Sequence, residues 1–263
     1  MNDFPVSAGL AIKEKATSLQ DLLNAKIELQ EFNNIFSYYP SMLWLRLAEG
    51  EIDSITPCPL DKKPYETNID YTESDDHLLM HISEMLHIVY LNKQCDLSPA
   101  EKMLKFLEWN YRYLLLSETT LVYAAMLFTN QFEIKAPKYS GSYAIDKVFE
   151  GCKNQAWDLT YLSDWSCFHY EEDNMDTIFL FATNDYLLKR IFINTYAEGG
   201  VNALLHTVFD QRDYDKIIDF IIDHQGECRN KPNFGHNPKE YFNQLIDNER
   251  QRLQEHQIHA IHI

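Results

Sequence analysis

A short, uninterrupted apolar segment at residues 177–182 constrains the fold of this chain more than any other feature. It reads Thr-Ile-Phe-Leu-Phe-Ala. A run of this length that is rich in Ile and Phe is typical of a strand covered on both faces, as in a parallel sheet. A helical pattern follows over residues 186–196. The segment therefore predicts a strand that leads into a helix, with Asp185 at the junction.

A second carboxylate precedes this strand on an expected helix. Residues 145–159 carry apolar side chains along one face, and Asp158 lies beside that face. Asn154 lies one turn earlier on the same side. Ligands of α/β proteins bind at the carboxyl edge of the sheet, which is where Asp185 is expected. We therefore expect Asp158 and Asp185 to meet at this edge.

The acidic residue on a helix, the apolar strand and the triplet Thr183-Asn184-Asp185 together resemble the C-terminal half of PIN-like nuclease domains. The resemblance covers residues 153–196. It implies a small parallel sheet and a metal-dependent ribonuclease that hydrolyses RNA phosphodiesters. It also implies that Asp158 and Asp185 bind Mg²⁺ or Mn²⁺ and take part in catalysis.

A PIN-like site needs two further acidic residues upstream. We assign Glu118 to the upstream acidic helix, as a catalytic and metal-binding residue, with Glu84 as the alternative. No aspartate follows an expected first strand, because Asp3 lies too near the start of the chain and Asp53 and Asp61 lie in a loop region. Either the first strand has been rebuilt, or the site has lost one ligand.

The two central carboxylates each have a structural interpretation as well. Asp185 is placed to cap a helix that begins at Tyr186, which is a common role of aspartate. Asp158 has the position of an ordinary exposed residue on a helix flank. Both interpretations stay open beside the metal site.

The charge of the chain bears on its partners. The chain has 23 Lys and Arg against 40 Asp and Glu, a net charge of −17, and it contains no basic tract. Nucleic-acid-binding proteins usually gain affinity from cationic side chains that neutralise phosphates. The resemblance implies an RNase toxin of a bacterial toxin–antitoxin or phage-defence system, with RNA and an antitoxin as partners. The alternative is a non-catalytic acidic protein of the inhibitor or immunity type that binds a basic partner.

Other classes of protein find little support in the sequence. No apolar run is long enough for a membrane span, and the first residues do not form a secretory signal. The five cysteines form no C-x-x-C pair, which favours reduced thiols in a cytoplasm. His77 and His81 have a zinc-compatible spacing, but no H-E-x-x-H motif is present. Motifs of serine nucleophiles, P-loops and dinucleotide-binding loops are absent as well.

Helical patterns fill most of the remaining chain. The clearest helix start is Ser98-Pro99-Ala-Glu101, with serine at the N-cap and proline at the first helical position. We predict a predominantly helical α/β protein whose small parallel sheet of PIN-like type has helical additions at both ends. The expected divisions are a helical region at 1–73, a PIN-like core at 74–210 and a helical extension at 211–263, with one compact unit as the alternative.

Overall fold

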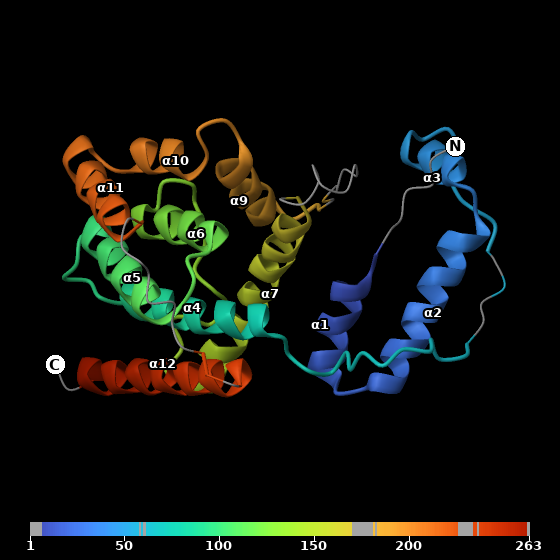
Figure 1. Ribbon diagram of the computed structural model, residues 1–263, viewed down its shortest axis with the longest axis horizontal. Coiled ribbons are helices and arrows are strands. Elements are labelled where there is room, and N and C mark those ends of the chain that lie inside the picture. Colours follow the sequence, from blue (N-terminus) through green and yellow to red (C-terminus); the bar gives the residue numbers. More distant parts are fainter. Residues whose placement is uncertain are drawn as a thin grey trace. The chain divides into compact units, whose positions relative to one another are not determined.

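A computed structural model describes residues 7–57, 59, 62–169, 181, 183–225, 234–235 and 237–261. Within these ranges every regular element is a helix, so the predicted α/β class with a PIN-like parallel sheet is wrong (Figure 1). Of the expected strand at 177–182, only Phe181 lies among the described residues, and it belongs to no helix or strand. A parallel strand needs neighbouring strands to bond, and the described ranges provide none.

The chain divides into two compact units, Met1–Ser74 and Asp75–Ile263. The first unit contains α1 (Gly9–Leu19), α2 (Leu22–Tyr38) and α3 (Ser41–Ala48). Helices α1 and α2 pack against each other around a small apolar cluster. The buried members of this cluster are Ile12, Ala16, Ala25, Leu29 and Tyr71.

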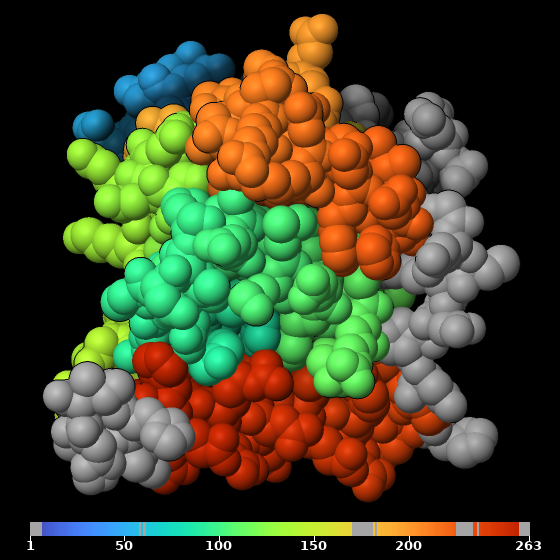
Figure 2. Space-filling view, turned by 90° about the vertical axis from the view of Figure 1, so that its left-hand side faces the viewer, coloured from blue at the N-terminus to red at the C-terminus, as the bar shows by residue number. Residues whose placement is uncertain are grey.

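The second unit is a bundle that surrounds one central helix, α4 (Figure 1). Its helices among the described residues are α4 (Asp76–Asn92), α5 (Pro99–Tyr113), α6 (Glu118–Thr129), α7 (Ile145–His169), α9 (Tyr186–Tyr196), α10 (Gly200–Val208), α11 (Gln211–Gln225) and α12 (Pro238–Ile261). Helix α4 packs against α5, α6, α7 and α12. Helices α9 and α10 pack on α6, and α11 packs on α5. Figure 2 shows α5 between α11 above and α12 below.

Side-chain caps fix where several of these helices begin. The Ser98-Pro99 start of α5 is confirmed, and Ser98 and Glu101 form a complete capping box. The carboxylate of Asp75 accepts from the backbone N–H of Leu78 at 2.8 Å and so starts α4. These caps satisfy N–H groups that have no acceptor within the helix, which is why the local sequence is enough to place them.

The central position of α4 determines the chemistry of the core. Helices surround α4, and most of its side chains are buried. Four of the buried ones are polar: His81, Ser83, Glu84 and His87. Ionisable groups in a core are stable only when they have hydrogen-bond partners, so these residues mark where polar groups of other helices must converge. In the described part of the chain, no helix combines the length and apolar character that a membrane crossing requires.

Candidate active site

The predicted site residue Asp185 caps a helix. Its Oδ1 accepts from the backbone N–H of Leu188 at 2.9 Å, at the start of α9. Its own backbone N–H donates to the hydroxyl of Thr183 at 3.0 Å. Asp185 therefore has the capping role that the sequence left open beside metal binding.

The other two predicted ligands lie on different helices. Asp158 is half-buried on α7 and accepts from Gln155 at 2.9 Å, and Glu118 is exposed in the first turn of α6. Among the residues that the structure describes, no three His, Cys, Asp or Glu side chains come close enough to hold a metal ion. The structure thus does not bring Asp158, Asp185 and Glu118 together, and a requirement for Mg²⁺ or Mn²⁺ stays a prediction.

A hydrogen-bonded chain of three side chains joins α4 to α7 instead. The Nε2 of His81 lies 2.7 Å from the Oγ of Ser163, and its Nδ1 lies 2.7 Å from the Oε2 of Glu84. A carboxylate only accepts hydrogen bonds, so the proton of the neutral imidazole lies on Nδ1. The Nε2 atom is then the acceptor for the hydroxyl of Ser163. This is the order of groups that activates a serine nucleophile.

Glu84, which the sequence offered only as the alternative metal ligand, is fixed by two further helices. Asn110 of α5 donates to its Oε1 at 2.8 Å, and Thr120 of α6 donates to its Oε2 at 2.8 Å. Glu84, His81, Asn110 and Thr120 are all fully buried. Such a network holds the carboxylate, and through it the imidazole ring, in one orientation.

The beginning of α6 lies beside Ser163. The hydroxyl of Thr119 is 3.4 Å from the hydroxyl of Ser163, and Ser117 caps the helix by accepting from Thr120. The first N–H groups of a helix have no acceptor within it, and the helix dipole places partial positive charge there. The start of α6 therefore adds partial positive charge beside Ser163.

A cavity of about 460 Å³ opens next to these groups. Ser163 is half-buried in its wall. Most of the remaining wall is apolar and comes from helices and from the segments between them: Met80, Leu115, Leu116, Tyr196, Phe234, Pro238 and Phe242. Asp76, His77 and Glu118 add ionisable groups to the lining. A volume of this size, with an apolar wall and a few polar groups, is typical of small-molecule sites.

His77 forms a separate ion pair beside this cavity. Its Nδ1 lies 2.6 Å from the Oδ1 of Asp164. The hydrogen bond to Asp164 raises the pKa of His77, against a smaller opposing effect of desolvation. The zinc-compatible spacing of His77 and His81 therefore has another explanation, because the two rings bind different partners on α7.

The sequence did not indicate Ser163 as a site residue or the role of His81. Serine-nucleophile motifs mark a strained turn after a strand, whereas Ser163 lies within a helix. One local signal was present, because His81 and Glu84 are three residues apart and so share a helix face. Nothing in the sequence around Ser163 indicates its distant partner.

Comparison with protein-family models, with curated proteins and with solved structures gives no match.

Proposed function

We propose that this protein is a serine-dependent hydrolase of esters with apolar acyl groups. The observation that carries the proposal is the chain Ser163–His81–Glu84, with 2.7 Å at each step, in the wall of a largely apolar cavity. The proposal rests on geometry, because nucleophile, base and orienting carboxylate are recognised by their mutual positions and not by sequence order.

In the first half of the reaction, the Oγ of Ser163 attacks the ester carbonyl and its proton moves to the Nε2 of His81. Glu84 stabilises the resulting imidazolium through Nδ1. The negative charge that forms on the carbonyl oxygen lies toward the start of α6, where the partial positive charge of the helix stabilises it. The imidazolium then returns its proton to the leaving alkoxide, which departs as an alcohol.

In the second half, water replaces the alcohol. His81 takes a proton from this water as the water attacks the acyl group on Ser163. The imidazolium then protonates the Oγ of Ser163 as the acyl bond breaks. The products are a carboxylic acid and the regenerated serine, so no oxidant, reductant or further reactant is required.

The walls of the cavity indicate the substrate class. Leu115, Leu116, Phe234 and Phe242 offer apolar contact for an acyl chain. Each buried methylene of that chain contributes about 0.8 kcal/mol to binding. The carboxylates of Asp76 and Glu118 also line the cavity, so an anionic leaving group is disfavoured there.

The metal-dependent ribonuclease depends on carboxylates that the structure does not bring together. The non-catalytic acidic protein with a basic partner stays a prediction.

The test uses the full chain with p-nitrophenyl esters of two, four and eight carbons and with a fluorophosphonate probe. We expect hydrolysis that is faster for the longer acyl chains, and one phosphonyl group on Ser163 by peptide mass spectrometry. Ser163→Ala should abolish the labelling and lower kcat by about 10³-fold or more. EDTA should have no effect on either measurement.

The matched control is Ser54→Ala, since Ser54 is an exposed serine of the first unit. It should leave hydrolysis and labelling unchanged. Labelling that persists in Ser163→Ala, or a wild-type protein that neither hydrolyses these esters nor reacts with the probe, would overturn the proposal. If the wild-type protein neither hydrolyses the esters nor reacts with the probe, the buried network has only the structural role of holding α4 against its neighbouring helices.

A further inference from the structure

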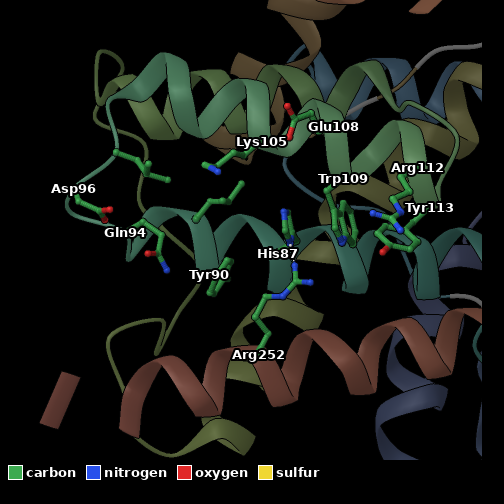
Figure 3. A pocket seen from close by; sticks show the side chains of 12 residues that line it. His87, Tyr90, Gln94, Asp96, Lys105, Glu108, Trp109, Arg112, Tyr113 and Arg252 are labelled. Carbon is green, nitrogen blue, oxygen red and sulfur yellow. Dashed lines mark hydrogen bonds between the residues drawn. The ribbon is translucent and has the colours of Figure 1, made fainter. Parts of the chain in front are cut away.

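A second cavity, of about 410 Å³, lies between α4, α5 and α12 (Figure 3). Its wall includes the side chains of Lys105 and Arg112 from α5 and of Arg252 from α12. It also includes two carboxylates, Asp96 and Glu108. In Figure 3 the guanidinium of Arg252 reaches toward His87, whereas the carboxylate of Glu108 points away from that ring.

The floor of this cavity is a buried polar network. His87 is stacked on Trp109, with ring centroids 4.3 Å apart and an angle of 6° between the planes. The Nδ1 of His87 lies 2.9 Å from the Oε2 of Glu249, and the indole N–H of Trp109 donates to the Oε1 of Glu249 at 2.9 Å. Arg252 adds an ion pair to the same carboxylate at 3.1 Å.

These contacts fix the protonation of His87. The Nδ1 atom also lies 3.2 Å from the guanidinium of Arg252, but that group donates to Glu249 instead. Since Glu249 only accepts and is the nearer partner of the ring, Nδ1 carries the proton, and Nε2 has a free lone pair in the neutral ring. Burial lowers the pKa of His87, although the hydrogen bond to Glu249 opposes this shift. The ring is therefore neutral at pH 7, and its Nε2 is an acceptor.

The Nε2 atom of His87 is buried without a hydrogen-bond partner among the described residues. The residue as a whole is 3% exposed. A buried acceptor that is left unsatisfied is destabilising, so native proteins seldom keep one without a ligand or water. The missing group must be a hydrogen-bond donor, because Nε2 can only accept.

We propose that this cavity binds a protonated phosphate group, either inorganic phosphate or the phosphoryl group of a small molecule. Lys105, Arg112 and Arg252 provide the positive charge for the anion, and Nε2 of His87 accepts the P–O–H proton. The remaining volume, with Tyr90 and Tyr113 in its wall, has room for the rest of a small phosphorylated compound. This site is separate from the cavity that contains Ser163, and it goes beyond the hydrolase activity.

Because the ligand must donate a hydrogen bond to Nε2 of His87, the site should distinguish phosphate from sulfate. Sulfate has nearly the shape of phosphate but carries no proton at neutral pH. Calorimetric titration at pH 7, at constant ionic strength in chloride, should show one site for phosphate and at least about tenfold weaker binding of sulfate. A phosphorylated compound that binds more tightly than inorganic phosphate would identify a phosphoryl group as the ligand. Equal affinities for inorganic phosphate and for the phosphorylated compound would identify inorganic phosphate as the ligand.

Two variants test the cationic side chains in the cavity wall and leave the buried network of His87, Trp109 and Glu249 unchanged. Lys105→Gln and Arg112→Gln should each weaken phosphate binding by about tenfold. The matched control is Lys147→Gln, because Lys147 is exposed on α7 and does not line the cavity. It removes the same charge and should leave binding unchanged. Ser163→Ala should also leave it unchanged, so this test is independent of the hydrolase.

Two results would overturn the proposal. One is that phosphate does not bind, or binds no better than sulfate. The other is that Lys147→Gln weakens binding as much as Lys105→Gln, since phosphate would then respond only to the net charge of the protein.

Discussion

The Nε2 atom of His81 lies 2.7 Å from the Oγ of Ser163, although 82 residues separate the two in sequence. Helix packing alone produces this contact, because one residue is on α4 and the other on α7.

Glu84→Gln should lower kcat for ester hydrolysis by about 10²-fold or more and leave KM within about twofold. The amide can donate to Nδ1 of His81 and so allow the wrong tautomer, in which Nε2 no longer accepts from Ser163. Steady-state kinetics from pH 5 to 9 measure both constants. The control is Glu150→Gln, an exposed position on α7. A change in KM with an unaltered kcat would show that Glu84 does not position His81.

His77 should make the protein less stable as the pH rises. Its pKa is raised in the folded state, chiefly by the hydrogen bond to Asp164. The folded state therefore binds more protons than the unfolded state above pH 6.5, and this stabilisation is lost as the pH rises through the raised pKa. Urea unfolding of the wild type and His77→Asn from pH 6 to 8.5 measures the difference. Parallel curves for the two proteins would contradict this prediction.

His87 should have the opposite effect. Burial lowers its pKa in the folded state, so the unfolded state takes up the proton first as the pH falls below 6.5. The free energy of unfolding should then decrease toward acid, by at most about 1.4 kcal/mol per pH unit from this group. His87→Gln should be less stable at every pH but have a smaller slope between pH 6.5 and 5. An unchanged slope would rule out His87 as its source.

Asp185→Ala should destabilise the protein by about 1 kcal/mol, since it removes the cap of α9. Asp185→Asn should change stability by only a few tenths of a kcal/mol, because the amide oxygen still accepts from Leu188. Thermal melts compare the three proteins with and without Mn²⁺. A melting temperature that rises with Mn²⁺ in the wild type alone would instead support the predicted metal site.

Gly151→Ala should be strongly destabilising. A Cβ at this position of α7 would lie 1.7 Å from the backbone oxygen of Lys138, so the chain must shift to admit it. Overpacking of this kind costs about 1–3 kcal/mol. Gly141→Ala is the control, because nothing lies within 4 Å of its added Cβ. Chemical denaturation measures the free energy of unfolding of both variants. Equal values would show that the backbone at Lys138 can move away from the added Cβ at little cost.

Local sequence was enough to predict the features that depend on neighbouring residues. The start of α5 at Ser98-Pro99 is confirmed, since a cap is made by groups within one turn. The cap at Asp185 was foreseen as an alternative for the same reason. The parallel sheet that was expected to contain a strand at 177–182 was not predictable in this way. An apolar run indicates burial, but only partner strands make it part of a sheet, and the described residues contain none.

The sequence by itself determined the acidic charge, most of the helical periodicity and several helix starts, because each depends on composition or on residues within a few positions. Only the tertiary structure decided which polar side chains meet. Glu84 contacts Asn110 and Thr120, and His81 contacts Ser163, because four helices pack against one another. A hydrogen bond across helices requires two chain segments to be placed within about 3 Å, and residue types or spacing along the chain do not specify that placement.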